Sequence, residues 1–238
     1  MRVLKFNDRT TRIVLLIIFG AWGCAVGCSG GSQSAMLRVV NGIWGSPLNV
    51  TIGGASAGSV PYSSCVNGVC TALSGYVTVK SGGVNLVVEQ EGSSTNIVPS
   101  QFQNLNLQPN TRNTIVFCPV GGTAIGAFLL QDDDTPAANS VKLRVANVSI
   151  NVPNMPAWIV VSGTQPSGNP TIANVPFGSA STYITFSPNT YDIYLVGLNC
   201  GLDSNCGDVT ATLQANQNVT VYLLWEGNGS RPTILADN

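Results

Sequence analysis

Leu37–Asn41 is the most informative stretch of this chain, because it occurs twice. It reads Leu-Arg-Val-Val-Asn, and Leu143–Asn147 reads Leu-Arg-Val-Ala-Asn, 106 positions later (143 − 37). Three further blocks repeat at this spacing or at one residue more: Leu107–Asn110 with Leu213–Asn216, Thr114–Phe117 with Thr220–Leu223, and Ser74–Val79 with Ser181–Phe186. Spacing this regular over most of the chain predicts two tandem domains of about 100 residues each.

Short runs of alternating apolar and polar residues indicate the secondary structure. Every second residue from Val84 to Val88 is apolar, and the same holds from Tyr191 to Leu195. A period of two is typical of half-buried strands, and turns rich in glycine and asparagine separate the runs. About seven short strands per copy predict an all-β fold of two tandem β-sandwiches of the immunoglobulin or transthyretin type. We expect these domains at residues 36–134 and 141–238, with a linker at 135–140.

Three features of the repeat resemble a known bacterial family. They are the opening Leu-Arg-Val-Val-Asn strand, a Tyr-containing strand after a Ser-rich turn (Tyr76, Tyr183), and a terminal Leu-x-Asp (Asp132, Asp237). The chain resembles the domain-of-unknown-function family 4397 over residues 36–238, a family often found in tandem on secreted proteins and lipoproteins. The resemblance implies a fold and an exported location, and it supplies no reaction. Members commonly carry histidine where this chain has Asn41 and Asn147.

The N-terminal residues predict export. A basic start with Arg2, Lys5, Arg9 and Arg12 leads directly into the apolar stretch Ile13–Gly27. This order is typical of a signal peptide, here expected at residues 1–27. The apolar stretch is shorter than the roughly 20 residues that span a bilayer, so a single-span membrane anchor is the alternative.

Cys28 is the candidate lipidation site. Ala25–Cys28 places small residues before a cysteine, which resembles the bacterial lipobox, and a polar tether follows at residues 28–35. A diacylglycerol on Cys28 would attach the mature protein to a membrane. We therefore expect an exported lipoprotein at the outer membrane, in the periplasm or on the cell surface. The alternative is an ordinary signal peptide cleaved near Ala35, which would remove Cys28.

The remaining cysteines suggest local disulfides. Cys65 and Cys70 flank a turn that contains Asn-Gly, and Cys200 and Cys206 flank a short polar loop. An exported chain can keep such pairs oxidised, and we expect one bridge in each loop. Loop entropy alone would favour a bridge from Cys70 to Cys118, and free thiols are a further alternative. Cys118 aligns with an apolar residue of the second copy, which predicts a buried side chain.

Composition excludes several classes of function. The chain has no histidine, 9% charged residues and a net charge of −1. It therefore cannot form a His-based triad, and it offers no basic surface for nucleic acid. Asp132–Asp134 lacks the spacing of a calcium loop, so we expect a solvated turn, no metal and no cofactor. Arg38 and Arg144 occupy matching positions, and we expect them to pair with the terminal Asp132 and Asp237 in a structural bridge repeated by duplication. A ligand role for the two arginines is the alternative.

Two tryptophans mark the candidate ligand loop. Trp44 and Trp158 each lie shortly after the first strand of a copy, and we expect a functional loop in their neighbourhood, at residues 41–47 and 147–156. Exposed indole rings could stack on sugars, whereas half-buried packing is the alternative. With no catalytic motif in the chain, we expect a non-catalytic binding, adhesion or structural module of the cell envelope, whose partner is an unknown envelope protein or a glycan. The alternatives are a carbohydrate-binding surface protein and an enzyme with a carboxylate-based site.

Overall fold

The structure is a computed structural model. It describes residues 33–238 except 63–64, 67–68, 71–74, 134, 196–207, 226–229 and 238, and it leaves undescribed the side chains of residues 65, 66, 69, 70 and 231. Gln33–Asn238 form one compact unit. The predicted signal peptide and Cys28 lie outside the described residues. No helix among the residues described is long and apolar enough to cross a membrane.

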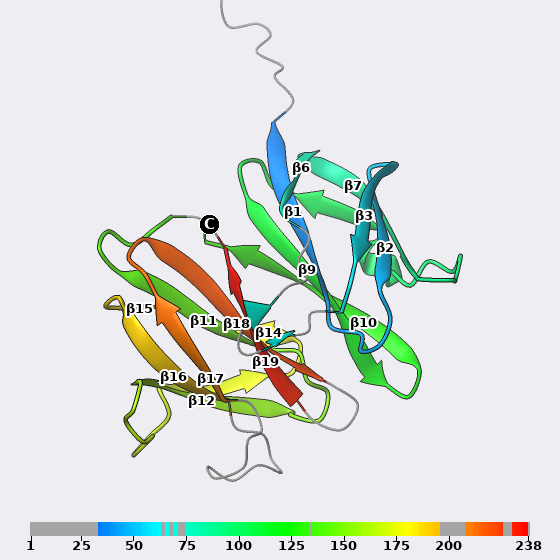
Figure 1. The fold of residues 1–238 in the computed structure, drawn as a ribbon. Helices are drawn as coiled ribbons and strands as arrows, with labels where there is room; N and C mark the ends of the chain where they lie inside the picture. The colour runs from blue at the N-terminus through cyan, green and yellow to red at the C-terminus, as the bar shows by residue number, and fades with distance from the viewer. Residues whose placement is uncertain are drawn as a thin grey trace, which may run out of the picture. The chain divides into compact units, whose positions relative to one another are not determined.

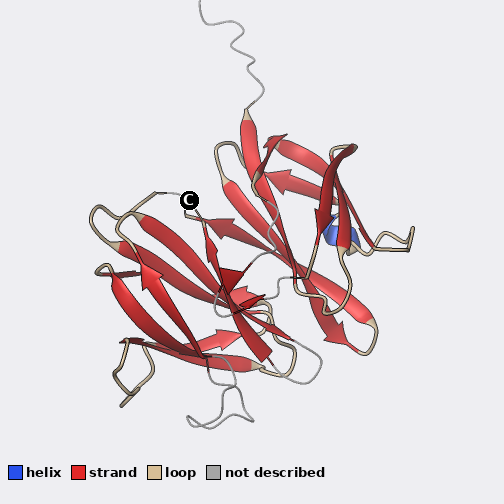
Figure 2. Ribbon diagram, in the orientation of Figure 1, coloured by secondary structure: helices blue, strands red, loops and turns tan. Residues whose placement is uncertain are grey.

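The described chain is all-β, as expected, with one 3-10 turn, η1 (Ser100–Phe102). Figure 2 shows strands in every part of the described chain. The first half holds β1 (Ser34–Asn41), β2 (Leu48–Ile52), β3 (Ala55–Val60), β4 (Cys65–Val66), β5 (Val69–Cys70), β6 (Val77–Lys80), β7 (Gly82–Gln90), β8 (Asn104–Leu107), β9 (Arg112–Gly121) and β10 (Ala124–Asp132). Its larger sheets have the orders β10-β9-β1-β6 and β3-β2-β7-β8, and β4 pairs with β5.

The second half repeats these pairings (Figure 1). Its strands are β11 (Val141–Asn147), β12 (Asn154–Val161), β13 (Ile172–Pro176), β14 (Ser179–Ala180), β15 (Ile184–Phe186), β16 (Asn189–Leu195), β17 (Asp208–Leu213), β18 (Gln217–Trp225) and β19 (Ser230–Ala236). The sheet orders are β14-β11-β18-β19, with β15 also on β11, and β13-β12-β16-β17. In both halves the first strand runs parallel to the last but one, β1 to β9 and β11 to β18.

A turn with an asparagine at positive φ precedes the second strand of each parallel pair. Asn110 and Asn216 precede β9 and β18 with φ of 56° and 67°. Asparagine tolerates this left-handed conformation better than most residues. The backbone N–H of Asn110 donates to Ser34 O at 2.7 Å, and that of Asn216 donates to Ser140 O at 2.8 Å. Each turn is therefore hydrogen-bonded to the start of the first strand of its half. Ser34 is the first residue of β1, and Ser140 directly precedes β11.

Three apolar clusters hold the strands together. One core lies between the two larger sheets of the first half, and a second lies between the two sheets of the second half. A third joins the halves, because it combines Val40, Val116 and Cys118 with Val148 and Leu224. In β9, Ile115 and Phe117 enter the first core whereas Val116 and Cys118 enter the third. This double burial explains why β9 is a continuous apolar run instead of an alternating one.

Candidate functional site

A cluster of charged and hydroxyl-bearing side chains lies where the two halves meet. Each half contributes an arginine from its first strand, a threonine from the parallel partner strand, a tyrosine and a terminal aspartate. These residues are Arg38, Thr114, Tyr76 and Asp132 from the first half, and Arg144, Thr220, Tyr183 and Asp237 from the second. Both arginines and both aspartates are at most 6% exposed. We call this set the interlock.

Each arginine pairs with the aspartate of the other half. Arg38 Nη2 donates to Asp237 Oδ1 at 2.7 Å, and its Nη1 donates to the carbonyl oxygen of Ala236 at 2.6 Å. Reciprocally, Arg144 Nη2 donates to Asp132 Oδ1, and its Nη1 donates to Gln131 O at 2.8 Å. The expected ion pairs with the two terminal aspartates are therefore present, and they form between the halves, since Arg38 approaches Asp132 of its own half no closer than 4.0 Å. The aspartates that close each half are turned towards the other half's arginine.

Hydroxyl groups of the same half hold each aspartate in position. Thr114 Oγ1 donates to Asp132 Oδ2 at 2.6 Å, and Tyr76 Oη donates to the same oxygen at 2.8 Å. The second half is equivalent, with Thr220 and Tyr183 donating to Asp237 Oδ2 at 2.6 and 2.9 Å. One carboxylate oxygen thus binds its own half, and the other binds the opposite arginine.

The tyrosine rings also stack on the arginines. Arg38 lies 4.6 Å from the ring centre of Tyr76, and Arg144 lies 4.6 Å from that of Tyr183. Burial is the main reason why the pKa of each tyrosine hydroxyl is raised, so both hydroxyls stay protonated donors. The attraction between a guanidinium and an aromatic ring is stronger where water is excluded, so this stacking stabilises the arginines in addition to their ion pairs.

Opposing influences act on the carboxyl of Asp132. Burial raises its pKa, as does the negative charge of Asp237, whereas the Thr114 hydrogen bond and both arginines act in the opposite direction. Two cations and two anions make the interlock neutral, and every carboxylate oxygen accepts a hydrogen bond within it. This arrangement is typical of a structural contact rather than a reaction centre, because its hydrogen-bond donors and acceptors are already paired with one another.

Asn41 and Asn147 are fully buried, and their side chains hydrogen-bond to the backbone. These are the two positions at which the resembling family commonly has histidine. Asn41 Nδ2 donates to the carbonyl oxygens of Ser46 and Val60 at 2.8 and 3.0 Å. Asn147 Nδ2 donates to those of Val152 and Val175 at 2.6 and 3.0 Å. Each side chain therefore ties the end of its first strand to two later backbone segments of its half.

The two tryptophans do not occupy equivalent positions. Trp44 lies in the loop after β1 and is 57% exposed. Trp158 lies inside β12, half-buried, and its Nε1 donates to Gly168 O at 3.3 Å. The expected placement in a loop is therefore wrong for Trp158, since the second strand begins at Asn154. Trp44 keeps an accessible ring, and a ligand role for either residue stays a prediction.

The cysteines are described in part. Cys65 and Cys70 pair directly across the β4–β5 ladder, in line with the expected hairpin, while their side chains lie outside the described residues. Cys200 and Cys206 also lie outside them, so both disulfides remain predictions. Cys118 is a fully buried free thiol in the third apolar cluster, as its alignment with Leu224 indicated.

The acidic run divides between two roles. Asp132 is buried in the interlock, so the expected solvated turn is wrong for this residue. Asp133 Oδ2 receives the ammonium of Lys142 at 2.6 Å. In the described part of the chain, no three Cys, Asp or Glu side chains are arranged to hold a metal ion.

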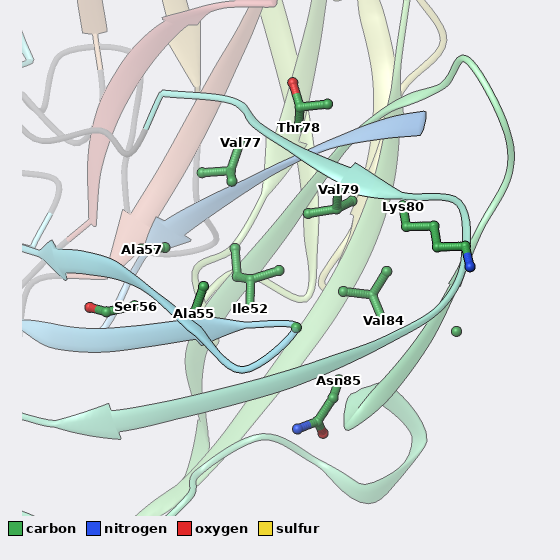
Figure 3. A pocket seen from close by; sticks show the side chains of 12 residues that line it. Ile52, Ala55, Ser56, Ala57, Val77, Thr78, Val79, Lys80, Val84 and Asn85 are labelled. Carbon is green, nitrogen blue, oxygen red and sulfur yellow. The ribbon is translucent and has the colours of Figure 1, made fainter. Parts of the chain in front are cut away.

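One hollow opens directly beside the interlock, and another lies elsewhere in the first half. A polar one of about 580 Å³ borders Gln131, Arg144 and Tyr183. An apolar one of about 330 Å³ lies in the first half between β3 and β6, with Ile52 and Val84 at its base (Figure 3). Sequence reasoning identified neither. The interlock's threonines and tyrosines were detectable in sequence as identical residue types within repeated blocks.

Two solved structures are remotely similar to the chain. A family 26 carbohydrate-binding module of Eubacterium rectale Amy13K, in complex with maltoheptaose, has 8% identity and a TM-score of 0.29, covering 85% of this chain and 96% of that one. A leucine-rich repeat protein of Bacteroides thetaiotaomicron has 10% identity and a TM-score of 0.21, covering 84% and 27%. No curated protein matches the chain.

Comparison with protein families is informative. The model of the domain of unknown function DUF4397 matches residues 35–158, which is just over half of the chain. The match contains all of the first half of the interlock and Arg144 of the second. It ends within β12, whereas the sequence resemblance was expected to extend to residue 238. The chain belongs to the DUF4397 family.

Proposed function

We propose that this protein is an exported lipoprotein whose two tandem β-sandwich domains, of the immunoglobulin or transthyretin type, form a non-catalytic binding, adhesion or structural module of the cell envelope. The interlock is the observation that carries the proposal. The buried arginines and aspartates, which could otherwise serve a reaction, are paired between the two halves, and each half-buried tyrosine donates to the aspartate of its own half. Two domains joined by buried contacts suit a module that presents a surface.

The start of the fold is compatible with anchoring at Cys28. β1 begins at Ser34, six residues after that cysteine. Six extended residues span at most about 20 Å. A lipid on Cys28 would therefore hold the folded body near the membrane surface, where an envelope module acts.

A lipidation experiment tests the anchor. Cells that express the full chain are labelled with radioactive or alkyne-tagged palmitate, and membranes are partitioned with Triton X-114. We expect the wild type to incorporate label and enter the detergent phase, and Cys28→Ser to do neither. Cys24→Ser is the matched control, because it removes the other cysteine of the N-terminal segment. Label that persists in Cys28→Ser would reject the lipoprotein assignment.

Glycan binding is the second candidate, and the exposure of Trp44 favours it. A ring that is 57% exposed offers a flat apolar face for a sugar. On an array of envelope glycans we expect retention that Trp44→Ala removes and Trp158→Ala weakens. Val161→Ala, another exposed apolar side chain, is the control. Equal retention by the Trp44 variant and the control would reject this candidate.

A further inference from the structure

An apolar groove opens between the two larger sheets of the first half. Its walls are β3 and β6, the edge strands of the sheets, and its base is formed by β2 and β7. Figure 3 shows Ile52, Val77, Val79 and Val84 pointing towards one another across this space. Ile52 and Val84 are buried members of the first core, and Val77 and Val79 pack against it half-buried. The groove is thus a direct opening to the hydrophobic core.

The second half has large side chains at the equivalent positions. Val79 pairs with Ala35 across β6 and β1, as Phe186 pairs with Val141 across β15 and β11. Ala35 and Val141 are 106 residues apart, the spacing of the repeat, so Phe186 is the counterpart of Val79. The chain thus has valine in the first half where the second half has phenylalanine.

Tyr191 is the counterpart of Val84 by the same reasoning. Val84 pairs with Leu105 in the first half, and Tyr191 pairs with Ala211, again 106 residues further along. The rings of Phe186 and Tyr191 contact each other with centroids 5.5 Å apart, and Tyr191 is only 6% exposed. In the second half, two aromatic rings therefore occupy the space that two valines leave open in the first.

The lining defines the chemistry of a ligand. Besides the four aliphatic side chains named above, the lining includes Ala55 and Ala57, and its polar residues Ser56, Thr78 and Asn85 are exposed. No aromatic residue or sulfur is among the lining residues. Lys80 is the sole charged residue of the lining, and it stands exposed at one end. A volume of about 330 Å³ lies at the small end of ligand pockets. An aliphatic wall with one terminal cation complements a single alkyl chain that ends in an anion.

We propose that this groove binds a medium-chain fatty acid, with the alkyl chain over Ile52 and Val84 and the carboxylate beside Lys80. The binding is non-covalent. The site goes beyond the proposed function, and it does not depend on lipidation of Cys28.

The location of Lys80 agrees with a ligand that comes from lipid. Lys80 pairs with Ser34, the first residue of β1, and Ser81 Oγ donates to Gln33 O at 2.8 Å. The cationic end of the groove is therefore the end at which the chain enters from its N-terminal segment. Under the proposed anchoring, this end lies nearest to the membrane.

Calorimetric titration with dodecanoate tests the site. The full chain with Cys28→Ser is the background for every variant, so that neither an acyl anchor nor detergent competes. In Val79→Phe/Val84→Tyr the groove receives the side chains that the second half already accommodates. We expect the dissociation constant to rise at least about tenfold, because the alkyl chain loses its place. Val161→Phe adds similar bulk at an exposed position, the last residue of β12, and should leave binding unchanged.

A second variant keeps the test informative if the filled groove disturbs folding. Lys80 is exposed, so Lys80→Gln should fold normally. It should weaken dodecanoate binding about threefold to fivefold and leave dodecanol binding unchanged, because only the acid carries a charge. Absence of dodecanoate binding to the parent chain, or equal affinity in the filled variant, would overturn the proposal. Equal effects of Lys80→Gln on acid and alcohol would overturn the role of Lys80.

Discussion

Asp132 and Asp237 show how a single carboxylate joins two halves of a chain. Each accepts two hydroxyl hydrogen bonds from its own half at one oxygen and an arginine of the other half at the second oxygen. Burying a charge is costly unless it is paired and hydrogen-bonded, and both conditions are met here. Removal of one member leaves its partners buried without compensation.

We therefore expect Asp237→Asn to lower the free energy of unfolding by about 3 kcal/mol, because Arg38 would keep its charge without its 2.7 Å partner. Urea denaturation followed by circular dichroism measures the change. Asp208→Asn alters an exposed aspartate of β17 and should cost less than about 0.5 kcal/mol. Similar losses in the two variants would contradict a stabilising role for the interlock.

The buried thiol of Cys118 should make the protein less stable at alkaline pH. Burial raises the pKa of its thiol from 9.0 to about 12. Between these values the unfolded chain releases the proton and the folded chain retains it, so stability falls as pH rises through this window. One pH unit above the unfolded value, the loss from this group is about 1.4 kcal/mol.

The measurement compares urea midpoints at pH 8 and pH 10 for the wild type and Cys118→Val. Substitution with valine removes the titrating thiol and keeps an apolar side chain in the third cluster. We expect the variant to lose less stability than the wild type over this interval. Identical losses would show that the thiol does not titrate differently in the folded state.

At the scale of elements, Asn41 and Asn147 end the first strand of each half. Their amide groups donate to carbonyl oxygens of later segments, and their own oxygens accept the N–H groups of Ile43 and Ser149 at 2.9 and 3.2 Å. A side chain that makes three backbone hydrogen bonds can fix how a strand leaves its sheet.

Asn147→Asp should destabilise the fold by about 3 kcal/mol. The carboxylate oxygen that replaces Nδ2 would face the carbonyl oxygens of Val152 and Val175 without a donor, in a fully buried position. Thermal melting at pH 7 detects the loss. The same change at Asn49, which is exposed on β2, should have little effect, and equal melting shifts would refute the bracing role.

At the scale of the whole molecule, the third apolar cluster and the interlock connect two halves that each have a core of their own. The connection buries apolar side chains and four charges together. We expect the two halves to unfold in one step, with equal calorimetric and van 't Hoff enthalpies. Scanning calorimetry of the full chain makes the test, and two resolved transitions would contradict it.

Much of the fold could be predicted from sequence because its signals are local. Alternation from Val84 to Val88 indicated a strand, and the repeated Leu-Arg-Val start located β1 and β11. The family resemblance is confirmed over residues 35–158. Trp158 was misplaced because residues between repeated blocks carry no periodic signal that distinguishes a loop from the beginning of β12.

Local patterns were sufficient for the strands, for the spacing of the repeat and for the buried position of Cys118, since each depends on neighbouring residues or on alignment of the two copies. Which aspartate each arginine binds could be identified only from the folded chain. Asp132 and Asp237 are equivalent in sequence, so only the packing of the halves distinguishes one from the other. The groove likewise arises because valines in the first half leave space that Phe186 and Tyr191 occupy in the second, and volume of this kind exists only between strands that are distant in the chain.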